Sequence, residues 1–226
     1  PTTGGFLGIE LCRHTATVRR YAELDGDDFV IIGGYESGID AAFHLAHQGK
    51  RCRILDKASP WESGGADPSI VLSTYSFERM RTLVFKERVE LLPNAAVTSV
   101  AQDEEGFSVH TADGQNLHTP VPPLFAGGFD GSLKLVSDLF EHREDGYPLL
   151  SDQDESTIVP GLFLCGPAVR HDDHIFCFIY KYRQRFAVVA KALATSLGLP
   201  AEGLETYRQW GMYLDDLSCC GGDCFC

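Results

Sequence analysis

The fold of this chain is decided by the stretch FVIIGGYESG, residues 29–38. Four apolar, mostly β-branched residues followed at once by two glycines are typical of a buried parallel strand that ends in a tight turn. Residues 36–48 then place apolar side chains on one helical face, and Gly49 ends that helix. Residues 51–56 supply the next strand. Strand, turn, helix and strand form a βαβ unit, which predicts a parallel sheet.

The rest of the chain continues this α/β pattern. Residues 1–27 lack clear periodicity and are expected to be a linker. Further helices are predicted over residues 77–88, 132–142, 174–197 and from 201, and further strands over residues 89–92, 124–126 and 161–165. Three short runs, residues 97–101, 107–111 and 115–119, are separated by turn sequences. This spacing predicts a three-stranded antiparallel meander.

The glycine turn, residues 33–38, stands where a dinucleotide-binding fingerprint belongs, directly after a strand and at the start of a helix. Such a turn presents helix N–H groups and the positive end of the helix dipole to a pyrophosphate. We therefore expect Gly33, Gly34, Tyr35, Glu36 and Ser37 to contact a cofactor. The match to G-x-G-x-x-G is imperfect because Tyr35 replaces the middle glycine, and Gly34 is expected to take over its role.

Two residues at the end of the second strand bear on the choice of cofactor. Asp56 falls about twenty residues after the turn, where an acidic side chain binds the adenosine ribose and favours NADH. The neighbouring Lys57, with Arg51 and Arg53 on the strand, could instead attract the 2′-phosphate of NADPH. The sequence leaves NAD and NADP both open.

Charge and hydropathy exclude several classes of protein. The chain has 19 Lys and Arg against 32 Asp and Glu, a net charge of −13, which argues against nucleic-acid binding. No stretch approaches the roughly 18 apolar residues of a membrane span, and no signal peptide is recognisable. We expect a soluble, cytoplasmic protein with no membrane partner.

The chain opens at Pro1 and not at Met. It is therefore expected to be a fragment, a processed product or a sequence that begins after the true start of the protein.

The order of motifs resembles the pyridine nucleotide-disulfide oxidoreductases of the thioredoxin-reductase type, and within them the bacillithiol-disulfide-reductase-like or flavin-monooxygenase-like branch. GGYESGIDA, residues 33–41, resembles the pyridine-nucleotide fingerprint of that branch. VPPLFAGGFD, residues 121–130, resembles the exit from its nucleotide domain, which adds Gly128 to the expected cofactor contacts. STIVPGLFLCG, residues 156–166, resembles a late flavin-domain motif.

The resemblance implies an NAD(P)-binding domain over residues 28–130, the C-terminal part of a FAD-binding domain over 131–200, and a helix with a Cys-rich tail over 201–226. The FAD fingerprint of the family's N-terminal half is absent, so the FAD site is expected to be incomplete in this chain. Where the family has Asp after the last glycine of its late motif, this chain has Pro167; Gly166 and Ala168 are left as backbone contacts.

By resemblance, the enzyme passes hydride from NAD(P)H to FAD and on to a disulfide or another small acceptor. A homodimer, or completion by the missing N-terminal half, is expected. The alternative is a non-catalytic nucleotide-binding or thiol- or metal-handling module that has lost its flavin half.

The eight cysteines fall into two groups, with Cys12, Cys52, Cys165 and Cys177 scattered along the chain and the other four at its end. Cys52, Cys165 and Cys177 each stand in an apolar run and are expected to be buried and reduced. Four others crowd the last eight residues: Cys219, Cys220, Cys224 and Cys226. This tail is interpreted in three ways, as a redox shuttle, as a clip for a soft metal ion, or as an inert oxidisable end.

Two expectations concern the region before and within the last long helix. Asp172 or Asp173 is expected to cap the N-terminus of the helix predicted from residue 174. Arg183 or Arg185, on that helix, could meet a cofactor phosphate.

Overall fold

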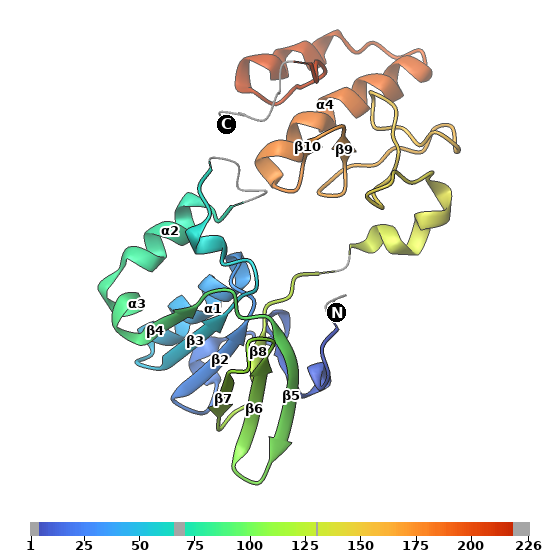
Figure 1. Cartoon of the computed structure of the whole chain (residues 1–226). Helices are drawn as coiled ribbons and strands as arrows, with labels where there is room; N and C mark the ends of the chain where they lie inside the picture. The colour runs from blue at the N-terminus through green and yellow to red at the C-terminus, as the bar shows by residue number, and fades with distance from the viewer. Residues whose placement is uncertain (1–4, 66–70, 130, 219–226) are drawn as a thin grey trace. The chain divides into compact units, whose positions relative to one another are not determined.

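The computed structural model describes residues 5–65, 71–129 and 131–218. It divides into two compact units, residues 1–130 and residues 131–226, shown in Figure 1.

The first unit is built on a five-stranded sheet with the order β1-β8-β2-β3-β4. Every pair of neighbouring strands in it is parallel, which confirms the predicted parallel sheet. Its strands are β1 (Arg13–His14), β2 (Asp28–Ile32), β3 (Arg51–Leu55), β4 (Val89–Leu92) and β8 (Leu124–Phe125). The βαβ unit predicted from residues 29–56 therefore lies at the middle of the sheet.

Helix α1 (Glu36–His47) packs its apolar face on this sheet because Ile39, Ala42 and Leu45 recur at helical spacing. All three side chains are 0% exposed. The helix predicted over residues 77–88 is instead two helices, α2 (Thr74–Arg81) and α3 (Leu83–Arg88). The break falls at Thr82, whose extended backbone (ψ 147°) interrupts the helix while its hydroxyl donates to the Arg79 carbonyl oxygen.

A second, antiparallel sheet has the order β5-β6-β7 and confirms the predicted meander. Its strands are β5 (Val97–Asp103), β6 (Gly106–Thr111) and β7 (Asn116–Thr119). Val100 and Val109 of this sheet pack with Val30 and Leu55 of the large sheet in one apolar cluster. Figure 1 shows this small sheet on one face of the large sheet and helices α1 to α3 on the other.

The N-terminal stretch expected to be a linker contributes to the first unit. It holds β1, which pairs with β8, and three short 3-10 helices, η1 (Ile9–Leu11), η2 (Thr15–Thr17) and η3 (Tyr21–Glu23). A strand of two residues and single helical turns have no periodicity to detect, so their sequence resembles that of a loop.

The second unit has less regular structure. Its elements are the 3-10 helices η5 (Ser132–Leu139) and η6 (Glu202–Trp210), the short strands β9 (Arg170–His171) and β10 (His174–Ile175), and helix α4 (Ile179–Ser196). Residues 161–165 are all described, and they contribute only a β-bridge from Phe163 to Glu155 where a strand was expected.

The start of the long helix was predicted wrongly. Residues 170–175 form an antiparallel hairpin with Asp172 in its turn at a φ of 45°. Helix α4 therefore begins at Ile179 and its N-cap residue is Phe178, so neither Asp172 nor Asp173 caps it. Short polar residues favour such left-handed turn positions as well as helix caps, which is why the sequence misled.

A buried ion pair organises the second unit. Arg185 and Asp154 are both 0% exposed. The Arg185 Nε lies 3.0 Å from Oδ2 of Asp154, and its Nη2 lies 2.8 Å from Oδ1. His171 Nε2 also contacts Asp154, at 2.5 Å from Oδ1. Arg185 is thus committed to the interior and is not available to a cofactor phosphate.

Candidate functional site

A cavity of about 720 Å³, called the edge cavity here, lies where β2, β3 and β8 end. The carboxyl ends of parallel strands are where open α/β sheets bind ligands. Residues predicted as cofactor contacts line it: Gly33, Tyr35, Glu36, Ser37, Asp56, Lys57 and Gly128. The structure therefore brings Gly33 and Gly128, which are far apart in the sequence, to the same cavity.

Two glycines of the turn are required by close packing of the backbone. Gly33 has a φ of +104°, and a Cβ built on it would lie 2.6 Å from the Ala126 carbonyl oxygen. A Cβ on Gly38 would collide with the Gly33 carbonyl oxygen. The turn can therefore bring α1 this close to β2 only with glycine at both positions.

Gly34 is also constrained by the packing of neighbouring side chains. A Cβ on Gly34 would collide with the Trp61 ring and lie 3.0 Å from the Cβ of Asp56. The missing side chain thus serves packing against these two residues. Tyr35, which replaces the middle glycine of the motif, is the N-cap residue of α1, lines the edge cavity and is 40% exposed.

The N-terminus of α1 opens into the edge cavity at Glu36 and Ser37. The first N–H groups of a helix have no intrahelical partner, and the helix dipole makes this end positive. Intrahelical bonding starts at Gly38 and Ile39, whose N–H groups both donate to the Tyr35 carbonyl oxygen. The arrangement suits an anionic group such as a pyrophosphate.

The Glu36 side chain is used to anchor helix α2. One carboxylate oxygen accepts the Ser73 N–H at 2.6 Å, and the other accepts the hydroxyls of Ser73 at 2.9 Å and Ser76 at 2.6 Å. Ser73 also caps α2 by accepting from the Ser76 N–H. Glu36 therefore shapes the wall of the edge cavity with a carboxylate that is already hydrogen-bonded.

The Asp56 carboxylate points at backbone N–H groups. Its Oδ2 lies 2.6 Å from the Gly34 nitrogen, and its Oδ1 lies 2.7 Å from that of Ala58 and 3.1 Å from that of Ser59. The residue is 9% exposed. Sequence reasoning identified this residue but not the direction of its side chain.

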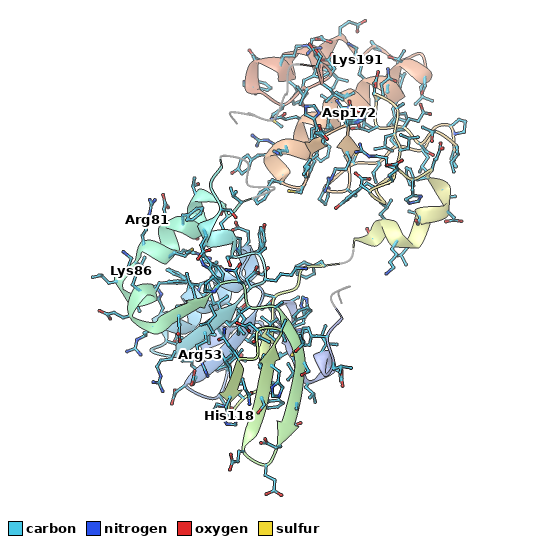
Figure 2. The ribbon with its side chains drawn as sticks, in the orientation of Figure 1. Arg53, Arg81, Lys86, His118, Asp172 and Lys191 are labelled. Carbon is cyan, nitrogen blue, oxygen red and sulfur yellow. The ribbon has the colours of Figure 1, made fainter. Side chains whose placement is uncertain are left out.

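Of the three basic residues considered for a 2′-phosphate, only Lys57 lies in the edge cavity, and it is exposed. Arg53 reaches the opposite end of the strands, where its Nη2 lies 3.1 Å from Asp28 Oδ2 and 2.7 Å from the His118 carbonyl oxygen (Figure 2). Arg51 lines a separate cavity with Asp28 and Arg53. Neither arginine lines the edge cavity.

His14 is a site residue that sequence reasoning missed. Its Nδ1 accepts the Ala16 N–H at 3.1 Å, so Nε2 carries the proton and donates to the Gly128 carbonyl oxygen at 3.0 Å. The ring also packs edge-on against Phe125 and Phe129. The stretch around His14 was expected to be a linker, and no spacing in the sequence links it to Gly128.

A second cavity of about 530 Å³, called the side cavity here, adjoins the first. Ser37 and Phe129 line both cavities. The side cavity is otherwise lined by 3-10 helices η2 and η3 and by polar residues of α1, among them Asp40 and His44. Tyr21 stacks on the His44 ring with centroids 5.9 Å apart.

Gly166, Pro167 and Ala168 belong to the second unit. Gly166 has a φ of +117°, and its carbonyl oxygen accepts the Val169 N–H. The Pro167 carbonyl oxygen accepts from Arg170 Nη1 at 2.8 Å, and proline has no N–H to offer. Within residues 131–218 no parallel strand leads into a helix N-terminus, so these residues do not form a pyrophosphate cradle for FAD.

The burial of the cysteine side chains agrees only in part with the expectation. Cys52 is buried as predicted, but Cys177 is half-buried and Cys165 is exposed. Burial, with the nearby Asp28, raises the pKa of Cys52 to about 12, and burial, with Glu10, raises that of Cys12 to about 12. Neither is a thiolate at neutral pH. The tail cysteines Cys219, Cys220, Cys224 and Cys226 lie outside the described residues.

Within the described ranges, no group of three or more His, Cys, Asp or Glu side chains is arranged to hold a metal ion. Nor is any helix in that part of the chain long and apolar enough to cross a membrane.

The five-stranded parallel sheet, the three-stranded antiparallel sheet and the glycine turn at the edge cavity define an α/β protein. The chain belongs to the pyridine nucleotide-disulphide oxidoreductase family, whose sequence model matches residues 1–166. Among curated relatives, Ferredoxin--NADP reductase 1 of Bacillus licheniformis is 28% identical over 155 residues, which cover 59% of this chain and 44% of the relative.

Solved structures share the fold. The chain matches bacillithiol disulfide reductase from Staphylococcus aureus with a TM-score of 0.66 and 21% identity, over 86% of this chain and 59% of that protein. It matches thioredoxin reductase from T. acidophilum with a TM-score of 0.64 and 17% identity, over 87% of this chain and 62% of that protein. This chain thus spans less than two thirds of each of these relatives.

Proposed function

We propose that the first unit binds NAD(P)H in the edge cavity, with the pyrophosphate at the N-terminus of α1. The observation that carries this proposal is the glycine turn, which brings the first N–H groups of α1 to the cavity at Glu36 and Ser37. The volume of about 720 Å³ lies within the range of about 300–1,000 Å³ usual for small-molecule sites.

The cofactor extends along the sheet edge in this proposal. Its adenosine half lies beside Asp56 and Lys57, which line the edge cavity at the end of β3. Its nicotinamide half passes Ser37 and Phe129, the residues common to both cavities, toward the side cavity. Asp40 and His44 there offer polar groups for a carboxamide.

The whole protein is proposed to be a flavoprotein oxidoreductase that passes hydride from NAD(P)H to FAD and on to a disulfide or another small acceptor. Membership of the family supports the reaction class. Named relatives act on different acceptors, among them bacillithiol disulfide and ferredoxin. In this proposal residues 28–130 hold the nicotinamide nucleotide, residues 131–200 complete a flavin domain, and a further segment, from the same or another chain, supplies the FAD pyrophosphate site. The proposed setting is the cytoplasm and the proposed assembly is a homodimer.

Calorimetric titration of the 226-residue chain tests the nucleotide site. NADPH or NADH is expected to bind at one site per chain. The Ser37→Asp variant adds a carboxylate where the pyrophosphate lies and is expected to weaken binding at least tenfold, or about 1.4 kcal/mol. Ser63→Asp, at an exposed residue that does not line the edge cavity, is the matched control. Failure of the wild-type chain to bind either nucleotide would refute the proposal.

Flavin content separates the enzyme from its alternative, a non-catalytic nucleotide-binding or thiol- or metal-handling module. The isolated chain is expected to hold FAD weakly or not at all, because residues 131–218 offer no pyrophosphate cradle. A protein in which the proposed further segment completes the flavin domain is expected to carry FAD and to oxidise NAD(P)H. A longer protein that binds the nucleotide but no flavin would favour the alternative. Thiol counting and metal analysis would assign the tail as shuttle, metal clip or inert end.

A further inference from the structure

Asp56 joins two loops at the edge cavity through its side chain. Its carboxylate accepts the Gly34 N–H of the glycine turn at 2.6 Å, and those of Ala58 and Ser59, in the loop after β3, at 2.7 and 3.1 Å. A carboxylate offers about four acceptor sites, so three of them are already in use. At 9% exposure the side chain has little surface left for a ligand.

A third loop is hydrogen-bonded to Asp56 and to Ser59. The Asp56 carbonyl oxygen accepts the Ala95 N–H at 3.0 Å, and the Ser59 hydroxyl oxygen accepts the Asn94 N–H at 2.8 Å. Residues 94–95 connect β4 to β5, and Ala95 lines the edge cavity. Three walls of the edge cavity are therefore fixed relative to one another through Asp56 and Ser59.

We propose that Asp56 is a positioning residue that holds the glycine turn in place, and that Lys57 is the residue that distinguishes the 2′ position of the adenosine. This inference rests on the proposed nucleotide site. It departs from the expectation that the acidic residue after the second strand of a βαβ unit binds the ribose hydroxyls.

The side chains that line the edge cavity favour one of the two nicotinamide cofactors over the other. An acidic side chain turned toward the ribose selects NADH because it repels a 2′-phosphate. Among the described residues that line the edge cavity, the acidic side chains are Glu36 and Asp56, and both accept hydrogen bonds from the protein. Lys57 is exposed, and it is the only Lys or Arg in the part of the cavity lining that the structure describes. The proposed site therefore favours NADPH.

Two variants separate the roles of the neighbouring residues. Asp56→Asn puts an amide NH₂ donor where the carboxylate accepts N–H groups, so we expect a lower Tm, a shifted Gly34 amide NMR signal, and about tenfold weaker binding of NADH and NADPH alike. Lys57→Gln is expected to weaken NADPH binding about tenfold and leave NADH binding and the Tm unchanged. Asp103→Asn is the matched control, since Asp103 accepts the Glu105 and Gly106 N–H groups in the β5–β6 turn.

Each outcome of these measurements supports or contradicts the role proposed for Asp56 or for Lys57. A selective loss of NADH binding in Asp56→Asn, with an unmoved Gly34 signal, would overturn the positioning role. Equal effects of Lys57→Gln on both nucleotides would overturn its part in selection. If Asp56→Asn fails to fold, Ser59→Ala, which loosens only the residue 94 contact, is expected to weaken both nucleotides equally. A wild-type chain that binds neither nucleotide refutes the proposed function, whereas the Tm and the Gly34 signal still report on Asp56.

Discussion

His14 and Gly128 are 114 residues apart in the sequence, yet the His14 Nε2 lies 3.0 Å from the Gly128 carbonyl oxygen. This hydrogen bond joins the N-terminal segment to the end of the segment that follows β8. Because Gly128 lines the edge cavity, the bond holds this wall of the cavity to the N-terminal segment.

The first prediction concerns this bond. His14→Leu keeps an apolar group near Phe125 and Phe129 but removes the donor to Gly128. We expect a loss of about 1 kcal/mol in the free energy of unfolding by urea. We also expect a several-fold weaker binding of NAD(P)H. His118→Leu, at an exposed position on β7, is the control and is expected to change neither quantity. Equal effects of the two variants would contradict the role assigned to His14.

The second prediction tests the close approach of α1 to β2. A Cβ on Gly38 would collide with the Gly33 carbonyl oxygen, a backbone atom that cannot move aside. Gly38→Ala is therefore expected to cost about 1–3 kcal/mol of unfolding free energy. Gly64→Ala is the control, because a Cβ there meets nothing within 4 Å and its φ is not positive. Thermal denaturation followed by circular dichroism measures both, and a Gly38→Ala protein as stable as wild type would show that the turn is looser than described.

The third prediction compares a buried ion pair with an exposed one. Asp154→Ala leaves Arg185 as an unpaired buried cation, which is expected to cost about 3–5 kcal/mol. Lys191, on the surface of the second unit (Figure 2), pairs with Glu205 at 2.7 Å, and both side chains are more than 40% exposed. Lys191→Ala is expected to cost much less, because solvent screens an exposed ion pair. Urea unfolding of both variants gives the comparison, and equal costs would refute the interior role of Asp154.

The fourth prediction follows from the pKa of Cys52. Burial raises this pKa from 9.0 to about 12, so the folded state holds the thiol proton more tightly than the unfolded state does. The stabilisation is fully present below pH 9 and is lost progressively as the pH rises toward 12. The Tm is expected to fall over this interval, and to fall less steeply in Cys52→Ala. In the native protein, iodoacetamide is expected to leave Cys52 unmodified at pH 8; rapid modification would contradict the burial.

Elements with strong local patterns could be predicted from the sequence. Residues 29–56 combine a β-branched run, a glycine turn and a helical apolar face, and residues 97–119 combine strands with turn sequences. Short elements could not be predicted, because β1 has two residues and is defined only by its pairing with β8. The types of the site residues were also predictable, but their directions were not. Asp56 has the expected position, and the fold decides that its oxygens meet Gly34, Ala58 and Ser59.

The pairing of β1 with β8 has a consequence for synthesis of the protein on the ribosome. Arg13 pairs with Leu124 and His14 with Phe125, so the first strand made receives its neighbour only after the last strand of the sheet has emerged. Until then the strand edges of β1 and β2 that receive β8 remain unpaired, and such edges are prone to associate with other chains. The edge cavity is completed in the same step, so we expect the proposed binding of NAD(P)H to begin only when translation has passed Gly128.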